Sequence, residues 1–117
     1  MIFEYVAKVS RVVDGDTLWM LVDLGFGIQA NLEFRLYGVN TPEVIGATKA
    51  LGLAAKGELE RLLSLGTLRI ITHKADKYGR WLAEVYVRPL NAVEISVNQS
   101  LLNAGFAKPY FGEGPKV

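Results

Sequence analysis

A strict alternation of apolar and polar side chains over residues 28–37 constrains the fold more than any other feature of this sequence. The apolar set is Ile28, Ala30, Leu32, Phe34 and Leu36, and the polar or amphipathic set between them is Gln29, Asn31, Glu33, Arg35 and Tyr37. Successive side chains of a β-strand point to opposite faces, so the alternation predicts a strand with one buried face. The chain must therefore build a sheet that covers this face.

Four further segments have strand character. Alternation over residues 3–10 predicts one strand, the β-branched, aromatic and aliphatic run 17–22 predicts a second, and shorter runs at about 67–72 and 81–87 predict two more. The Asp14-Gly15 pair between the first two is typical of a hairpin turn with positive φ at both central residues.

Two helices complete the predicted elements. Apolar side chains recur at three- and four-residue steps from Ala47 to Leu63, which predicts an amphipathic helix that ends at Gly66. A shorter helix is predicted at about 95–103, ended by Gly105. The order of three strands, helix, two strands, helix indicates a mainly β, α+β fold, either an antiparallel sheet curled over a helix or a small five-stranded barrel with two flanking helices. We favour the barrel, because short strands in so small a domain need their edges closed or covered.

Composition narrows the classes of function. The 117 residues are expected to form a single domain, 1–117, with 112–117 as a loose tail. The chain has no cysteine and one histidine, His73, which excludes disulfides, thiolate nucleophiles, Cys-based zinc sites and His-rich metal sites.

The longest uncharged run, 95–107, is too short to span a bilayer, so no membrane partner is expected. The N-terminus lacks a signal-peptide pattern, which predicts an intracellular location, although a removed leader would leave the same sequence.

Four short segments carry side chains suited to chemistry: Asp14-Gly15-Asp16-Thr17, Arg35, Asn40-Thr41-Pro42-Glu43 and Asp76-Lys77-Tyr78-Gly79-Arg80. Each also has a structural interpretation. These are a hairpin turn, a solvated strand face, a helix start with Thr41 as N-cap and Pro42 at the first helical position, and a polar turn between strands. For His73 only a structural role at a strand end is expected.

The functional interpretation treats the same segments together. Asp16 offers a carboxylate to a hard cation, with Asn40 and the Thr41 carbonyl as neutral oxygen ligands, and Glu43 is a candidate general base. Arg35 and the 76–80 loop supply cationic groups for a phosphate. The loop lies in the region from Arg69 to Arg88, which has a net positive charge of its own although the whole chain is only +1. Together these are the parts needed to cleave a phosphodiester: an activated water, a metal and cations around the phosphate.

The segments 12–17 (VVDGDT), 34–43 (FRLYGVNTPE), 76–80 (DKYGR) and 97–108 (VNQSLLNAGFAK) resemble the motifs of the thermonuclease family, typified by staphylococcal nuclease. They occur in the family's order with compatible spacing. The resemblance implies a five-stranded OB-like barrel with helices at its side. It also implies calcium-dependent hydrolysis of DNA and RNA, with a preference for single-stranded substrate.

The resemblance implies roles for nine residues. The catalytic set is Arg35, Glu43 and Arg80, in which Glu43 activates or orders the attacking water and the arginines stabilise the phosphoryl transition state. The metal set is Asp16, Asn40 and Thr41, and the substrate-binding set is Lys77, Tyr78 and Tyr110. The first two of the substrate-binding set match positions that contact a terminal phosphate, whereas Tyr110 either stacks on a base or packs against the barrel.

Two departures from the family pattern matter. Asn40 stands where the best-known members carry a calcium-binding aspartate, which predicts weaker calcium binding or greater tolerance of another divalent cation. Residues 23–28 lengthen one hairpin, which would serve as a substrate wall or as an oligomer contact; the oligomeric state is not determined by sequence.

Three hypotheses for function remain open at this point. The first is a metal-dependent nuclease. The second, which Asn40 favours, is a catalytically weak or inactive OB-like domain that binds nucleic acid or a protein partner. The third is a structural or interaction role without nucleic acid, which the net charge of +1 allows.

Overall fold

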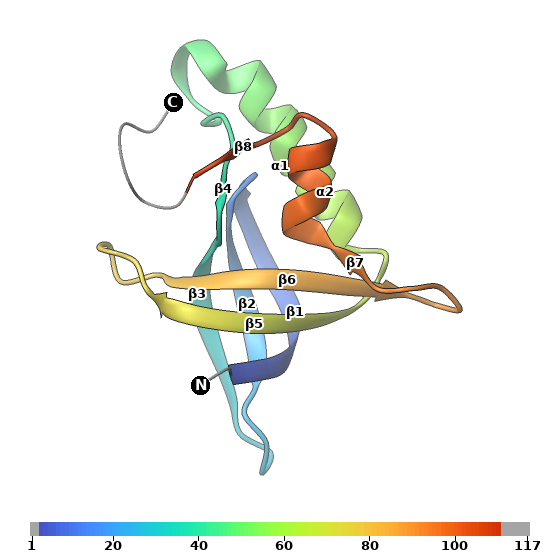
Figure 1. The fold of residues 1–117 in the computed structure, drawn as a ribbon. Helices are drawn as coiled ribbons and strands as arrows, with labels where there is room; N and C mark the ends of the chain where they lie inside the picture. Colours follow the sequence, from blue (N-terminus) through green and yellow to red (C-terminus); the bar gives the residue numbers. More distant parts are fainter. Residues whose placement is uncertain (1–2, 111–117) are drawn as a thin grey trace.

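The computed structural model describes residues 3–110 (Figure 1). The strands are β1 (Phe3–Asp14), β2 (Thr17–Asp23), β3 (Gln29–Leu36), β4 (Val39–Asn40), β5 (Gly66–Ala75), β6 (Trp81–Pro89), β7 (Ile95–Ser96) and β8 (Lys108–Pro109). The helices are α1 (Lys49–Leu63) and α2 (Val97–Asn103), and a short 3-10 turn, η1 (Gly46–Thr48), directly precedes α1. The predicted tail at 112–117 lies outside the described residues.

Five strands close into a barrel. Strand β1 pairs antiparallel with β2 and with β5, β2 pairs with β3, and β5 pairs with β6. The barrel closes where β3 and β6 run parallel, with Phe34 opposite Trp81 and Leu36 opposite Ala83. This closed mixed barrel with two helices confirms the predicted α+β, OB-like fold. Figure 1 shows the helices at one end of the barrel and the β2–β3 hairpin projecting from the other.

The barrel interior and the helices share one apolar core. Burial alternates along β6, where Ala83, Val85 and Val87 are buried and the residues between them are partly exposed. Leu59 and Leu101 bring α1 and α2 onto the same core. Each fully buried aliphatic side chain of this kind contributes roughly 1.5–3 kcal/mol. The alternation predicted for β3 fails at both ends of the strand: Ile28 lies exposed in the hairpin beyond the barrel, and Arg35 is buried together with Phe34 and Leu36.

The predicted helix start at Thr41 and Pro42 is wrong. Helix α1 begins at Lys49, and residues 41–45 form an irregular segment between β4 and η1. Gly46 has a φ of 66°, which a right-handed helix running on from Pro42 could not contain, so the helix forms only after it. A tertiary contact orders the segment before it: the backbone N–H of Thr41 donates to the Asp16 carboxylate, 3.0 Å away. The segment that resembles the family motif is thus held by the barrel and not by helix capping.

The interpretation of Asp14-Gly15 as a turn with positive φ is also wrong. Asp14 pairs with Thr17, so the two loop residues are Gly15 and Asp16, and neither has a positive φ. Glycine is needed here for space. A Cβ on Gly15 would lie 2.7 Å from the Thr41 hydroxyl and 2.8 Å from the Ala55 side chain.

No helix in the described part of the chain combines the length and the apolar character needed to cross a lipid bilayer.

Candidate active site

Asp16 is a buried carboxylate at the centre of the candidate site. The Thr17 hydroxyl donates to its Oδ1 over 3.1 Å, and the Thr41 N–H donates to its Oδ2 over 3.0 Å. The Arg35 guanidinium lies 3.5 Å from the same Oδ2. A buried carboxylate is stable only with such partners, so Asp16 ties the β1–β2 loop to β3 and to the segment after β4.

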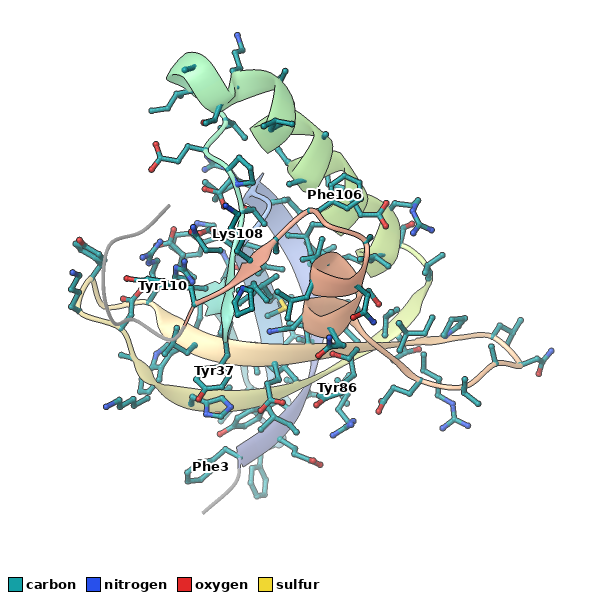
Figure 2. The ribbon with its side chains drawn as sticks, turned by 45° about the horizontal axis from the view of Figure 1, so that its top comes forward. Phe3, Tyr37, Tyr86, Phe106, Lys108 and Tyr110 are labelled. Carbon is teal, nitrogen blue, oxygen red and sulfur yellow. The ribbon has the colours of Figure 1, made fainter. Side chains whose placement is uncertain are left out.

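Arg35 is only 6% exposed, so its interpretation as part of a solvated strand face is wrong. Its Nη1 donates to the Val39 carbonyl over 2.9 Å, and its Nη2 lies 3.4 Å from Asn40 Oδ1. The Tyr110 ring lies over the guanidinium at 5.4 Å. The chain after β3 thus folds back over the outer face of the barrel, and Figure 2 shows Tyr110 following β8, which runs beside β4.

Asn40 and Thr41 are both buried next to this arginine and Asp16. The Thr41 hydroxyl, in a residue 3% exposed, has no hydrogen-bond partner among the described residues. Buried hydroxyls are almost always paired, so an unpaired one beside a carboxylate marks a place where a ligand or water belongs.

Asp14 is a member of this cluster that the sequence analysis missed. Its Oδ1 accepts the Asp16 N–H over 3.1 Å. Burial, a side-chain hydrogen bond with Asp16 and the Asp16 charge together raise the pKa of Asp14 to about 6. The signal for it was present in the Asp-Gly-Asp pattern, where the first carboxylate was assigned only to a turn.

Arg80 joins the site from the 76–80 loop. Asp76 Oδ2 accepts from its Nε at 2.9 Å and pairs with its Nη2 at 2.8 Å, while Nη1 lies 3.5 Å from the Thr17 hydroxyl. Burial opposes ionisation of Asp76, but N–H donation from Arg80 and Tyr78 and the Arg80 charge lower its pKa. The loop is therefore both the predicted polar turn and a rigid support for the arginine.

Lys77, Tyr78 and Glu43 lie at the surface of the same region. Lys77 Nζ and the Arg80 guanidinium lie 5.3 and 5.4 Å from the centre of the exposed Tyr78 ring. Glu43 is exposed, and the Thr48 hydroxyl donates to its backbone carbonyl over 2.9 Å. These contacts join eight of the nine predicted residues into one cluster, and the ninth, Glu43, follows Thr41 two positions later in the chain.

Two supporting residues also escaped the sequence analysis. The Asn98 side chain of α2 accepts a hydrogen bond from the Val85 N–H and donates to the carbonyls of Tyr37 and Ala83, at 2.9 to 3.1 Å. These bonds connect α2 and β6 to the turn that leads to β4. Its only signal was a polar residue inside an uncharged run. His73 is not a simple strand end: its ring stacks on Tyr37 at 4.0 Å, and Nε2 lies 2.7 Å from a Glu84 carboxylate oxygen.

The donor atoms around Asp16 fit a hard cation. They are carboxylate oxygens of Asp14 and Asp16, the Asn40 amide oxygen and the unpaired Thr41 hydroxyl. Within residues 3–110 no three His, Cys, Asp or Glu side chains gather as a metal-binding group, so amide, hydroxyl, carbonyl or water oxygens would complete the coordination. An all-oxygen set suits calcium or magnesium better than zinc or copper.

Comparison with known proteins identifies the family to which this barrel belongs. The family model described as "Staphylococcal nuclease homologue" matches residues 33–116, so the chain belongs to the family of staphylococcal nuclease homologues, and the predicted resemblance is confirmed. Over 92% of its length the chain is 34% identical to a thermonuclease of Staphylococcus hyicus and 34% identical to the uncharacterized protein MJ1439 of Methanocaldococcus jannaschii. It is 30% identical to endonuclease YhcR of Bacillus subtilis, again over 92% of this chain. The matches cover 64%, 60% and 9% of these relatives, so the chain spans less than two thirds of each.

Proposed function

We propose that residues 1–117 act as a single metal-dependent nuclease domain that hydrolyses phosphodiester bonds of DNA or RNA and prefers single strands. The observation that carries this proposal is the contact between a buried carboxylate, Asp16, and Arg35, with Arg80 attached through Thr17. Two relatives that carry the names thermonuclease and endonuclease support the same class of activity.

Asp16, Asn40 and Thr41, through its carbonyl and its unpaired hydroxyl, would hold the cation, with Asp14 beside them. When bound, a divalent cation supplies positive charge to the phosphate oxygens and helps to orient water. We propose calcium, because the family resemblance implies it and the all-oxygen donors suit it. The neutral Asn40 would lower calcium affinity and widen the choice to other divalent cations.

The side chains of this chain divide the remaining work. The exposed Glu43 carboxylate would take a proton from the attacking water, which a free carboxylate at the surface is placed to do. Arg35 and Arg80 would donate to phosphate oxygens as negative charge grows on them. Both guanidiniums are already held by other groups, so little reorganisation is needed during reaction.

The substrate-binding set would extend contact beyond the scissile phosphate. Lys77 and Tyr78, at the tip of the loop that carries Arg80, would contact a terminal phosphate. Tyr110, whose ring already packs on Arg35, would offer its other face to a base. An extended single strand can present separate phosphates and an unstacked base to such a surface, which supports the proposed preference.

The test is cleavage of matched single-stranded DNA, double-stranded DNA and RNA, each with calcium and with chelator. We expect chelator to abolish cleavage and Glu43→Gln to reduce kcat by two or more orders of magnitude. Arg35→Lys and Arg80→Lys should each lose most activity, because lysine keeps the charge but not the planar fork. Arg88→Lys, at an exposed arginine of β6, is the matched control and should keep normal turnover.

Asn40 favours a second candidate, a barrel that binds nucleic acid without cleaving it. Salt-sensitive binding of single strands without cleavage in any divalent cation would establish that function in place of the nuclease. Absence of both binding and cleavage would favour the structural role.

A further inference from the structure

The lengthened β2–β3 hairpin ends in a closed apolar tip. Leu24 N donates to the Ile28 carbonyl and Ile28 N donates to the Gly25 carbonyl, both over 2.9 Å. The Asp23 carboxylate accepts from Gly25 N over 2.8 Å. These bonds hold the loop in one conformation, yet Leu24, Phe26 and Ile28 are all exposed, and Phe26 completely so.

Phe26 also has an unusual backbone. Gly25, Phe26 and Gly27 have successive φ values of 83°, 57° and 75°. Glycine adopts this left-handed region readily, but a bulky aromatic residue seldom does, and it is then strained. Phe26 contributes no burial to its own fold, so the tip presents a strained, ordered aromatic side chain entirely to the outside.

The same end of the barrel carries an apolar pocket of about 290 Å³. Its lining residues are Phe3, Tyr5, Val22, Leu24, Leu32, Phe34, Thr72 and Trp81. Phe3, Leu24 and Trp81 are exposed at its rim. Figure 1 shows the hairpin projecting from this end, and Figure 2 places Phe3 there, away from the helices.

We propose that this pocket receives Phe26 from a second copy of the chain, and that two copies exchange this side chain reciprocally about a two-fold axis. The projection and the pocket share Leu24, so they are neighbours on one surface, and a single two-fold operation satisfies both contacts. Pockets of roughly 300–1,000 Å³ hold drug-sized ligands, so a volume of about 290 Å³ has room for one phenyl ring.

The charges around the tip favour a second copy over nucleic acid or lipid. Residues 23–29 contain one acidic side chain, Asp23, and no basic one, so the tip does not attract phosphates or anionic headgroups. A fully exposed aromatic side chain presents roughly 150–250 Å², so Phe26 together with the half-exposed Phe3 and Trp81 offers on the order of 300–500 Å² per copy. With the partly exposed Leu24 and Ile28 this makes up more than half of the roughly 800 Å² per partner of an ordinary stable interface. The inference does not depend on the proposed nuclease activity.

Size-exclusion chromatography with light scattering, which measures the mass of the protein in solution, tests the proposal when it is run over a wide range of protein concentrations. We expect a mass that rises toward twice the 12.9 kDa of one chain. Phe26→Asp should raise the dissociation constant at least 100-fold. The matched control is Leu90→Asp in the β6–β7 loop, which places the same charge at a residue that is 89% exposed and should leave the mass unchanged.

A mixing experiment distinguishes a reciprocal exchange from other contacts. Phe26→Asp keeps the pocket intact, whereas Trp81→Asp keeps the aromatic tip intact. Each variant alone should be monomeric, and the equimolar mixture should form a dimer through the one contact that remains. Circular dichroism of each variant establishes that it is folded, and Trp81→Leu replaces Trp81→Asp if the charge unfolds the barrel.

Three results would overturn the proposal. They are a wild-type protein that stays monomeric at every concentration, a Leu90→Asp variant that dissociates as fully as Phe26→Asp, and a mixture that stays monomeric. A Phe26→Asp variant with unchanged mass but weakened binding to single-stranded DNA would instead assign the tip to the substrate.

Discussion

Gly52 of α1 lies against the backbone carbonyl of Glu43, with no room for a Cβ between them. The Thr48 hydroxyl donates to the same carbonyl oxygen over 2.9 Å. Glycine inside a helix is unfavourable by about 1 kcal/mol relative to alanine, a cost that this close approach explains. The first turns of α1 thus determine where the proposed general base stands.

Gly52→Ala should therefore displace Glu43. We expect kcat to fall about 10–100-fold, since small displacements of a catalytic group have effects of this size. Overpacking should also lower the free energy of unfolding by about 1–3 kcal/mol. Kinetics and urea unfolding measure the two effects, and Gly57→Ala, where a Cβ meets nothing within 4 Å, is the control. The control should be stabilised by up to about 1 kcal/mol with unchanged turnover, and normal kcat in Gly52→Ala would exclude this positioning role.

Asp14 should make stability depend on pH. Burial, helped by Asp16, raises its pKa from 3.8 to about 6, so the folded protein binds this proton more tightly than the unfolded chain does. The stabilisation is complete below about pH 4 and is lost as the pH rises through about 6. Asp14→Asn cannot ionise, and at pH 7 it should be more stable than wild type by of the order of 1 kcal/mol after allowance for solvent screening.

Urea unfolding in chelator at several pH values between about 4 and 7 checks this expectation. The difference between the variant and wild type should grow with pH across this window. A constant difference would mean that Asp14 does not titrate there.

Asn40→Asp should strengthen calcium binding. The change adds a further negative charge beside Asp14 and Asp16, and the charge of the ligands tunes calcium affinity, so we expect an increase of about 10–100-fold. Without calcium the added repulsion should lower the melting temperature. Calorimetric titration and thermal unfolding with and without calcium measure both effects. Asn31→Asp adds the same charge at an exposed position of β3 and should leave affinity unchanged; equal affinities for the two variants would remove Asn40 from the metal set.

Asp76→Asn should loosen Arg80. Asp76 Oδ2 contacts both Nε and Nη2 of the arginine, at 2.9 and 2.8 Å, while Oδ1 accepts from the backbone N–H groups of Tyr78 and Arg80. An asparagine has one acceptor oxygen and no charge, so it cannot serve both the backbone and the guanidinium. We expect kcat to fall about 10-fold or more while the loop keeps its fold, because the asparagine oxygen can still accept from the backbone of Tyr78 and Arg80.

The control for this prediction breaks a comparable ion pair elsewhere. Glu58→Gln removes the pairing of Glu58 with the exposed Arg61 on α1, at 2.7 Å, and should change neither turnover nor stability by a measurable amount. Equal activity of Asp76→Asn and Glu58→Gln would show that Arg80 needs no support from Asp76.

The five barrel strands and the two helices were predictable from sequence because their signals are local, whereas β4, β7 and β8, of two residues each, were not predicted. Alternation along β3 and apolar spacing along α1 follow directly from which faces are buried. The helix start at Thr41 was wrong for the complementary reason. Its residues satisfy the local rules for an N-cap, but in the folded chain the Thr41 N–H donates to Asp16, 25 positions away, and Gly46 adopts a positive φ that an α-helix does not contain. Local patterns carry no information about such distant partners.

By itself, the sequence determined the element types, the mainly β fold and the family, because periodicity and motif order lie in the chain itself. Only the tertiary structure decided that Arg35 is buried under β4 and Tyr110, and that Asp14 shares the environment of Asp16. It alone showed that a side chain at Gly15 would clash with Thr41, and that the Phe26 side chain is fully exposed. The burial of Arg35, the close approach of Gly15 to Thr41 and the raised pKa of Asp14 all depend on segments that are far apart in the chain. These features arise only when the barrel brings those segments together.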